Sequence, residues 1–304
     1  MEKFNWKINE ESKISRLDKF ISENSELTRT YIQKLLAEGL VLVNGNKAKA
    51  NYKIKINDDI ELTVPDAVEL EAKPEDIPLN VVFEDSDVIV INKPKGLVVH
   101  PGSGNPDHTL VNALLFHCKD LSGINGVLRP GIVHRIDKDT TGLLVCCKND
   151  KSHLAIANQL MDKTCKRKYI ALVHGVIPHE FGTVEAPIGR SKKDRKKMTV
   201  TSENSKEAIT HFKVLERFKD FTLIQCELET GRTHQIRVHM EYIKFPIVGD
   251  YKYSLRKTME TTGQMLHAYE LSFIHPTTNE RVTFEAPLPK YFNDILEELR
   301  VNNV

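Results

Sequence analysis

The spacing of apolar residues over positions 15–64 predicts two helices followed by a few strands. Apolar side chains recur at helical spacing both before and after Thr28. Thr28 is a suitable N-cap for the second helix, and Gly39 is a suitable C-terminal stop for it. The pair Asn44-Gly45, which favours a hairpin turn, lies between two strand-like runs, and a further strand is expected over residues 54–64. With a lead-in strand or arm over residues 1–14, residues 1–64 are expected to form a small α+β domain.

The pattern changes between residues 65 and 78. Pro65, Pro74 and Pro78 punctuate an acidic stretch without apolar periodicity, which is typical of a linker. From residue 79 to 304, strand-like runs outnumber helical ones. We expect strands over residues 81–83, 88–91, 168–174, 208–218, 221–229, 265–273 and 281–285, and helices that start near residues 110, 154 and 289. Because many strands are neighbours in sequence, these residues predict an α+β fold with a largely antiparallel mixed sheet, not a doubly wound one.

The most unusual stretch joins two apolar β-type runs, residues 131–133 and 143–147. Several charged and hydroxyl side chains, including Arg135 and Asp137, lie between these runs. A turn needs only a residue such as Gly142 to set its backbone angles, so the charged groups serve another purpose. Catalytic groups concentrate on loops held by a rigid sheet, and Asp137 is therefore the leading catalytic candidate. A surface Arg–Asp pair in a polar hairpin is the alternative.

Two metal-binding motifs match part of this loop. Asp137 and Asp139 have the spacing that opens a calcium loop, but Lys148 stands where a bidentate Glu is required. The same aspartates resemble the nucleophile motif of magnesium-dependent phosphatases, although His134 and Arg135 place positive charge where the metal would lie. The phosphatase stays as the second hypothesis.

Composition and charge limit the function classes. The 304 residues contain no apolar run long enough to span a membrane and no apolar signal segment at the start, so we expect a cytoplasmic protein. Five cysteines without C-x-x-C spacing exclude a zinc ribbon and a disulfide framework. The net charge is only +1, yet the basic loop, residues 190–197, concentrates six cations. That density favours RNA contact, and its candidate phosphate ligands are Lys192, Lys193, Arg195 and Lys196.

A second polar constellation is the run TGRTHQIRVH, residues 230–239. Gly231 breaks a strand and helical spacing begins at Ile236, so Arg232 lies where a strand gives way to a helix. His234 and His239 are five residues apart, not the four of a zinc-binding helix, and we expect them to make ordinary hydrogen bonds.

Several of these segments resemble motifs of the RluA/RluD-type pseudouridine synthases. Residues 134–144, HRIDKDTTGLL, resemble the family motif HRLDxxTSGLL, and residues 230–239 resemble TGRxHQIRxH in the expected order. Residues 267–276 resemble the family's HAxxLxFxHP strand, which is read as scaffold. Residues 16 to 64 resemble the S4 RNA-binding domain, and this resemblance turns the interpretation of Arg16 and Arg29 from a solvated face to RNA binding.

The resemblance implies an enzyme that isomerises uridine in RNA to pseudouridine without a nucleotide, metal or redox cofactor. Asp137 is the implied catalytic carboxylate, as a nucleophile or through a glycal-like intermediate, and Arg232 is its implied guanidinium partner. Tyr169, which the residues alone would place in the packed core, is the implied active-site tyrosine that stacks on uracil and moves a proton at C5. Arg135 matches the arginine that fills the space of the extruded nucleotide.

The same resemblance implies the substrate. An S4 domain joined to this catalytic domain is similar to enzymes that act on large-subunit (23S) ribosomal RNA or a pre-ribosomal particle, and we expect a monomer. His134 and Thr141, which belong to the first motif, are assigned to substrate binding. A protein that binds RNA without catalysis is a further alternative, but it would leave Asp137 and its arginines without a purpose.

Overall fold

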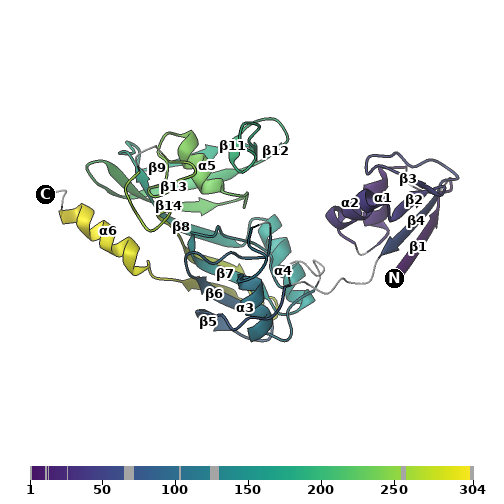
Figure 1. The fold of residues 1–304 in the computed structure, drawn as a ribbon, viewed down its shortest axis with the longest axis horizontal. Helices are drawn as coiled ribbons and strands as arrows, with labels where there is room; N and C mark the ends of the chain where they lie inside the picture. The colour runs from purple at the N-terminus through teal and green to yellow at the C-terminus, as the bar shows by residue number, and fades with distance from the viewer. Residues whose placement is uncertain are drawn as a thin grey trace. The chain divides into compact units, whose positions relative to one another are not determined.

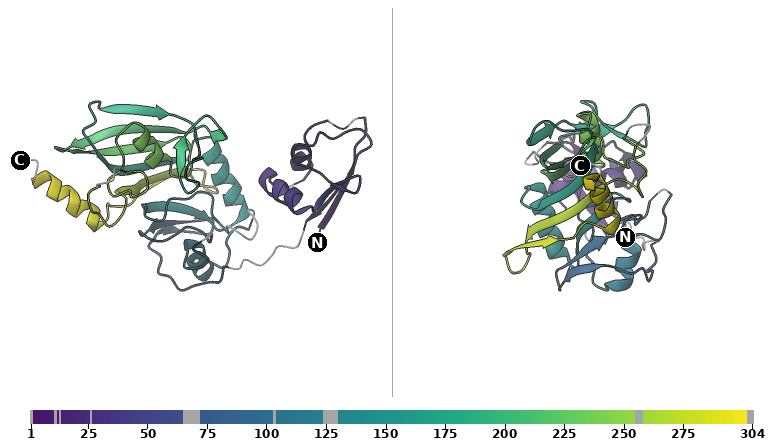
Figure 2. Two further views of the ribbon diagram at one scale, coloured as in Figure 1. Left: turned by 45° about the horizontal axis from the view of Figure 1, so that its top comes forward. Right: turned by 90° about the vertical axis from the view of Figure 1, so that its left-hand side faces the viewer.

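The structure is a computed structural model that describes residues 2–10, 12, 14–25, 27–64, 72–102, 104–123, 130–254 and 258–301. The chain divides into a small unit, Met1–Glu69, and a large unit, Leu70–Val304 (Figures 1 and 2). Among the helices in these described ranges, none has the length and apolar character that crossing a membrane requires.

The small unit packs two helices on a four-stranded sheet of order β1-β4-β2-β3. Its elements are β1 (Glu2–Lys7), α1 (Leu17–Glu23), α2 (Arg29–Glu38), β2 (Val41–Val43), β3 (Asn46–Lys47) and β4 (Asp59–Val64). The Thr28 hydroxyl accepts a hydrogen bond from the backbone N–H of Tyr31, and Gly39 ends α2 in the left-handed region at φ 77°, so both predicted helix limits are confirmed. Strand β4 starts later than predicted, because the Asp58 carboxylate accepts a hydrogen bond from the Lys55 N–H and turns the chain there.

The large unit is built on a nine-stranded sheet. Strand order is β5-β6-β7-β15-β8-β14-β13-β9, with β16 beside β15, and a smaller sheet has the order β11-β10-β12. The elements are β5 (Val81–Glu84), β6 (Val88–Lys93), α3 (Leu110–His117), β7 (Thr141–Cys147), α4 (Asp150–Met161), β8 (Lys166–His174), β9 (Phe181–Glu185), β10 (Ile188–Arg190), β11 (Met198–Val200), β12 (Ser205–Lys206), β13 (Ile209–Arg217), β14 (Phe221–Leu228), α5 (Gln235–Tyr242), β15 (Leu266–Ile274), β16 (Arg281–Glu285) and α6 (Lys290–Val301). Within the described sheet the β7–β15 pairing is parallel and the other strand pairs are antiparallel, which confirms the predicted α+β class.

Strands β6 and β7 are buried on both faces, which explains their unbroken apolar sequence. On β6, Ile89 and Ile91 belong to the same core as α3, whereas Val88 and Val90 belong to the core that includes Ile156 of α4. Helices α3 and α4 therefore cover opposite faces of this half of the sheet (Figure 1). Fully burying a side chain of this size stabilises a fold by roughly 1.5–3 kcal/mol, so the sheet gives the loop that precedes β7 a rigid support.

Two expectations about strands were wrong. Residues 131–133 form no strand in the described chain; Ile132 makes a single bridge to Cys146, because Gly131 adopts φ 69°. Strands β9 to β12 were not predicted, since they are two to five residues long and two of them are interrupted by Gly182 and Gly189. The basic loop connects β10 to β11.

The predicted linker lies partly outside the described residues, which resume at Ala72. Residues 72–78 contain neither helix nor strand, but they are attached to the large unit. Ala72 is buried in its core, and the Asn112 side chain of α3 donates a hydrogen bond to the Lys73 carbonyl at 2.9 Å. The Glu75 N–H in turn donates to the Asn112 carbonyl at 3.0 Å. The second half of this stretch is therefore part of the large unit's packing.

Candidate active site

Asp137 lies in the loop that leads into β7, and the end of β6 holds that loop in place. The fully buried Lys93 ammonium donates hydrogen bonds to the carbonyls of Pro94 (2.8 Å), Leu97 (2.9 Å) and Lys138 (3.0 Å). Just beyond the loop, Gly142 adopts φ 109°, and a Cβ there would lie 2.1 Å from the Ala268 carbonyl oxygen. Gly142 therefore permits β15 to pass close beside the end of the loop.

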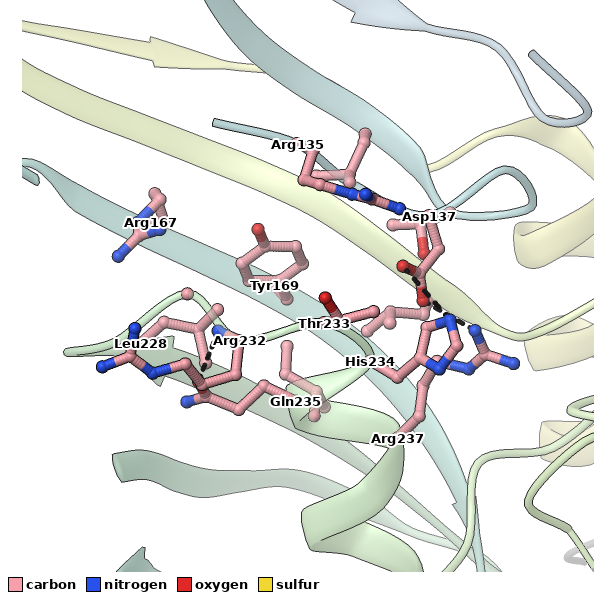
Figure 3. A pocket seen from close by; sticks show the side chains of 15 residues that line it. Arg135, Asp137, Arg167, Tyr169, Leu228, Arg232, Thr233, His234, Gln235 and Arg237 are labelled. Carbon is pink, nitrogen blue, oxygen red and sulfur yellow. Dashed lines mark hydrogen bonds and ion pairs between the residues drawn. The ribbon is translucent and has the colours of Figure 1, made fainter. Parts of the chain in front are cut away.

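The guanidinium that binds Asp137 is that of Arg237 and not, as predicted, that of Arg232. Nη1 of Arg237 donates to Oδ2 of Asp137 at 2.7 Å, while Nε and Nη2 donate to the buried Asp250 carboxylate at 2.6 and 2.9 Å. Arg232 precedes α5, where its Nε donates to the Glu207 carbonyl at 2.8 Å. Figure 3 shows Arg232 at the opposite end of the pocket from Asp137. Arg237 reaches the carboxylate because it lies on the first turn of α5, which faces the loop before β7.

The surroundings of Asp137 keep its carboxyl group ionised. Its side chain is 15% exposed, and burial alone would raise the pKa. Electrostatic interactions with His234, Arg237 and Arg135, together with the hydrogen bond from Arg237, act against burial and hold the pKa below its ordinary value. The second carboxylate oxygen, Oδ1, lies 3.9 Å from Nε2 of His234, which is beyond hydrogen-bonding distance. Asp137 therefore presents a charged oxygen to the space in front of it.

Tyr169 lies on β8 and lines the pocket beside Asp137 (Figure 3). Burial raises the pKa of its hydroxyl to about 12, so the phenol is protonated at neutral pH. Arg167, two residues earlier on the same strand, lines the same pocket and is 7% exposed. Its buried Nε has no hydrogen-bond partner in the described part of the chain. Sequence reasoning missed Arg167, although its alternation with Tyr169 along a strand places both on one face.

Two adjoining cavities meet at Asp137. The Tyr169 cavity has a volume of 50 Å³ and is lined by Tyr169 and Arg167. The Lys252 cavity has a volume of 350 Å³ and is lined by Lys138 and Lys252. The residues that line both are Arg135, Ile136, Asp137, His234 and Arg237. The predicted Arg135 is therefore brought to the site, with its side chain exposed.

Two residues that were predicted to bind substrate, His134 and Thr141, instead hold β7 in place. Nε2 of His134 accepts a hydrogen bond from the Val145 N–H at 3.1 Å, and burial lowers the pKa of this histidine to about 3. The Thr141 hydroxyl lies 2.8 Å from Nδ1 of His267, and both residues are buried. Their side chains are used by the scaffold, which corrects their assignment to substrate binding. The reading of residues 267–276 as scaffold agrees with this contact.

The predicted RNA-binding residues differ in their surroundings. Arg16 and Arg29 are half-exposed, but both bind the fully buried Asp18 carboxylate, with hydrogen bonds of 3.0 to 3.2 Å. In the basic loop, Lys192 forms an ion pair with Glu203. The other predicted cations of that loop, Lys193, Arg195 and Lys196, are exposed.

The geometry around Asp137 disfavours a magnesium phosphatase. A guanidinium already occupies Oδ2 of Asp137, where such a metal would bind. In the described ranges, the side-chain groups that could hold a metal ion are Glu84, His117 and Cys118, and Asp85, Asp87 and His275. Asp137 belongs to neither group. His239 makes ordinary hydrogen bonds, as expected, to Thr210 and the Ala186 carbonyl.

A charged carboxylate below a cleft rich in cations is suited to chemistry on a nucleic acid, and comparison with known proteins identifies which chemistry. Residues 87–242 match the family model for RNA pseudouridylate synthase, and residues 15–60 match the S4 domain. The chain is 57% identical over 294 residues to the uncharacterized RNA pseudouridine synthase YlyB of Bacillus subtilis, which covers 96% of this chain and 97% of that protein. It is 43% identical over 302 residues to ribosomal large subunit pseudouridine synthase D of Zymomonas mobilis, with 95% of each chain covered.

A solved structure supports the fold. Human RNA pseudouridylate synthase domain containing 1 superposes with a TM-score of 0.58 at 24% identity, covering 73% of this chain and 95% of that one. The chain belongs to the RNA pseudouridine synthase family and carries an S4 domain ahead of the residues that match the synthase model. It is an isomerase that acts on RNA.

Proposed function

We propose that the protein isomerises uridines of large-subunit (23S) ribosomal RNA, with Asp137 as its catalytic carboxylate. The observation that carries the residue assignment is the ionised Asp137, bound by Arg237 at 2.7 Å where the two cavities meet. The substrate assignment is supported by the S4 domain and by relatives named ribosomal large subunit pseudouridine synthase D.

The reaction makes one demand that this site meets. The bond from C1′ of ribose to N1 of uracil breaks, a bond from C1′ to C5 forms, and a hydrogen leaves C5 while N1 gains one. No atom is added and no electron is lost. Asp137 acts on the sugar as a nucleophile or by assisting a glycal-like intermediate, and both routes need an ionised carboxylate. Its Oδ1, which is not engaged by Arg237, is the oxygen that faces the ribose.

The two cavities suggest how the nucleotide lies. With uracil stacked on Tyr169, the bond to be broken lies beside Asp137, and the ribose and its phosphates extend into the Lys252 cavity toward Lys138. Tyr169 provides the stacking surface, and its phenol is protonated before uracil binds. Arg167, at the other end of the Tyr169 cavity, is placed to donate to a uracil carbonyl.

Further residues bind the rest of the RNA. Arg135, exposed at the mouth of both cavities, fills the gap that the extruded uridine leaves in the RNA stack, and the basic loop and the S4 domain bind phosphates. A single chain supplies both Asp137 and Arg237, which supports action as a monomer. We place this activity in the cytoplasm, where ribosomal RNA is modified.

Mapping pseudouridines tests the proposal. Ribosomal RNA is compared between cells with the gene, cells without it, and deletion cells that express either the wild-type protein or Asp137→Asn. We expect specific 23S pseudouridines to disappear on deletion, to return with the wild-type protein, and to stay absent with Asp137→Asn. If only transfer RNA loses pseudouridine, the ribosomal substrate is wrong. If Asp137→Asn restores the sites, the role of Asp137 is wrong.

A further inference from the structure

Tyr253 connects the basic loop to the residues around Asp137. Its ring is buried in a cluster with Ile188 and Val238. Its hydroxyl oxygen accepts a hydrogen bond from the backbone N–H of Met198 at 2.8 Å and lies 2.6 Å from Nδ1 of His234. A phenol carries one hydrogen, and among the described residues Nδ1 of His234 is the acceptor within hydrogen-bonding distance of it, so we assign that hydrogen to the bond with Nδ1. Nδ1 of His234 is therefore an acceptor.

This assignment determines the state of His234. Burial lowers the pKa of its imidazole to about 4, so the ring is neutral at working pH and holds one hydrogen. Since Nδ1 accepts from Tyr253, the ring hydrogen is on Nε2. That nitrogen faces Oδ1 of Asp137 across 3.9 Å, about 1 Å longer than an N–H···O hydrogen bond. A donor thus points at the free carboxylate oxygen without yet reaching it.

The backbone of His234 determines where its side chain lies. His234 is the N-cap of α5 and adopts the left-handed region, with φ 58°. Asparagine, aspartate and histidine are the non-glycine residues that adopt this region most readily. This backbone holds the imidazole beside Tyr253 and Asp137.

On the side away from Asp137, Tyr253 contacts residues at the end of the basic loop. Met198 is the first residue of β11 and directly follows the loop. The Lys197 ammonium lies 5.8 Å from the centre of the Tyr253 ring, and the Lys252 ammonium donates to the Lys196 carbonyl at 3.3 Å. The guanidinium of Arg237 lies over the same ring at 5.0 Å. Tyr253 therefore contacts the loop that binds RNA and both partners of Asp137.

We propose that Tyr253 and His234 are positioning residues that couple RNA binding at the basic loop to the orientation of the Asp137 carboxylate. When phosphates bind the basic loop, the hydrogen bonds from Met198 to Tyr253 and from Tyr253 to His234 transmit the movement of the loop. The distance between Nε2 of His234 and Oδ1 of Asp137 then shortens from 3.9 Å to that of a hydrogen bond, and Nε2–H donates to Oδ1. The carboxylate is then held on both oxygens, by Arg237 and by His234, with a remaining lone pair directed at C1′. The inference rests on the proposed role of Asp137.

Two substitutions test separately the two contacts of His234, with Tyr253 and with Asp137, which together we call the relay. Tyr253→Phe removes the hydroxyl that orients His234. His234→Asn suits the left-handed backbone and keeps an acceptor near the position of Nδ1, but it lacks the donor toward Asp137. We expect each to lower kcat by about 10- to 100-fold, the size of effect that a misplacement of about 1 Å causes, with KM for RNA nearly unchanged. His234→Gln, whose amide nitrogen reaches the place of Nε2, recovers part of the rate.

The measurement uses unmodified 23S ribosomal RNA transcribed with tritium at C5 of uridine, because tritium is released when the C5 hydrogen leaves. Tyr242→Phe is the control, since Tyr242 is 53% exposed at the end of α5. In the basic loop, neutralising Lys193, Arg195 and Lys196 together should lower kcat at saturating RNA as well as raise KM. If the loop only binds RNA, the triple substitution changes KM alone. That result overturns the proposed coupling between the basic loop and Asp137.

A spectroscopic readout distinguishes positioning from mere support. Nitrogen NMR of the labelled histidines should show His234 with its hydrogen on Nε2 in the wild type, and a mixture of tautomers in Tyr253→Phe. If Tyr253→Phe and His234→Asn both keep the wild-type kcat, or lower only thermal stability, the relay is wrong even though Asp137→Asn is inactive. If Asp137→Asn releases tritium at the wild-type rate, the proposed function of Asp137 fails first.

Discussion

Asp18 in the small unit and Asp137 in the large unit begin from the same local sequence but are used differently. Asp18 ends the tripeptide Arg16-Leu17-Asp18, and Asp137 ends Arg135-Ile136-Asp137. Both carboxylates bind guanidinium groups, and both have a pKa below the ordinary value. By composition and by charge the two tripeptides are equivalent.

The two carboxylates differ in how many of their oxygen lone pairs accept hydrogen bonds. Arg16 and Arg29 each donate two hydrogen bonds to Asp18, Gln33 donates a fifth at 2.8 Å, and the side chain is 0% exposed. Asp137 is 15% exposed, accepts one hydrogen bond from Arg237 and lines two cavities. A carboxylate with every acceptor site filled holds a fold together. One that is kept charged but incompletely bound is available for chemistry.

Replacing each aspartate by asparagine tests this difference with the largest expected effect on the reaction rate. Asp137→Asn should lower the rate of pseudouridine formation by about 10⁴-fold, as expected when a residue that contacts the reacting atoms is lost, with thermal unfolding nearly unchanged. The rate is followed by tritium release from C5 at saturating RNA. Asp18→Asn is the matched control, because it removes the same charge from a carboxylate that is 0% exposed and fully hydrogen-bonded. Equal rate losses in both variants would contradict the distinction drawn here.

The arginine partners give the next largest effect. Arg237→Met removes the cation beside Asp137 and leaves the Asp250 carboxylate without two hydrogen bonds. We expect kcat to fall by about 10²- to 10³-fold, comparable to the loss of one charge-stabilising group in other active sites.

The pH dependence of that variant has a definite sign. In the wild type the pKa of Asp137 lies below its ordinary value, so the rate should not fall as the pH is lowered from 8 to 5. Without Arg237, burial raises the pKa of Asp137, and the rate should decline within this range as the carboxylate takes up a proton. The profile of kcat/KM against pH measures this. Arg232→Met should keep the wild-type profile, and an acid limb in that variant would restore Arg232 as the partner of Asp137.

The sequence singled out Asp137 as a candidate but assigned it Arg232 instead of Arg237 as its partner, and the reason is local geometry. Arg232 and Arg237 occur in one motif, and the turn between the end of β14 at Leu228 and the start of α5 at Gln235 decides which of them reaches Asp137. A left-handed residue at His234 is part of that turn, and no hydrophobic period reveals it. Asp250 was missed for a related reason, since it enters from a later turn and makes contact only in the folded chain.

The same limit applies to the fold. Helices α1 and α2 could be predicted because their limits depend on near neighbours, such as the cap at Thr28. Strands β9 to β12 could not, because strands of two to five residues carry too short a pattern and form only through pairing in the folded chain, such as that of β10 with β11 across the basic loop.

The smallest effect is expected on the stability of the small unit. Asp18→Asn leaves Arg16 and Arg29 without a charged partner, but both are half-exposed and regain water, so the cost should be about 1–3 kcal/mol. Trp6, the one tryptophan of the chain, lies in β1 of this unit, so its fluorescence during urea unfolding reports this unit alone. Because the pKa of Asp18 is lowered in the folded state, its stabilisation is present above the unfolded value of about 4 and is lost as the pH falls through the folded value. The difference between wild type and Asp18→Asn should therefore narrow below about pH 4, while kcat at saturating RNA stays within about two-fold. A gap that is constant with pH would mean that Asp18 stabilises the unit by shape and not by charge.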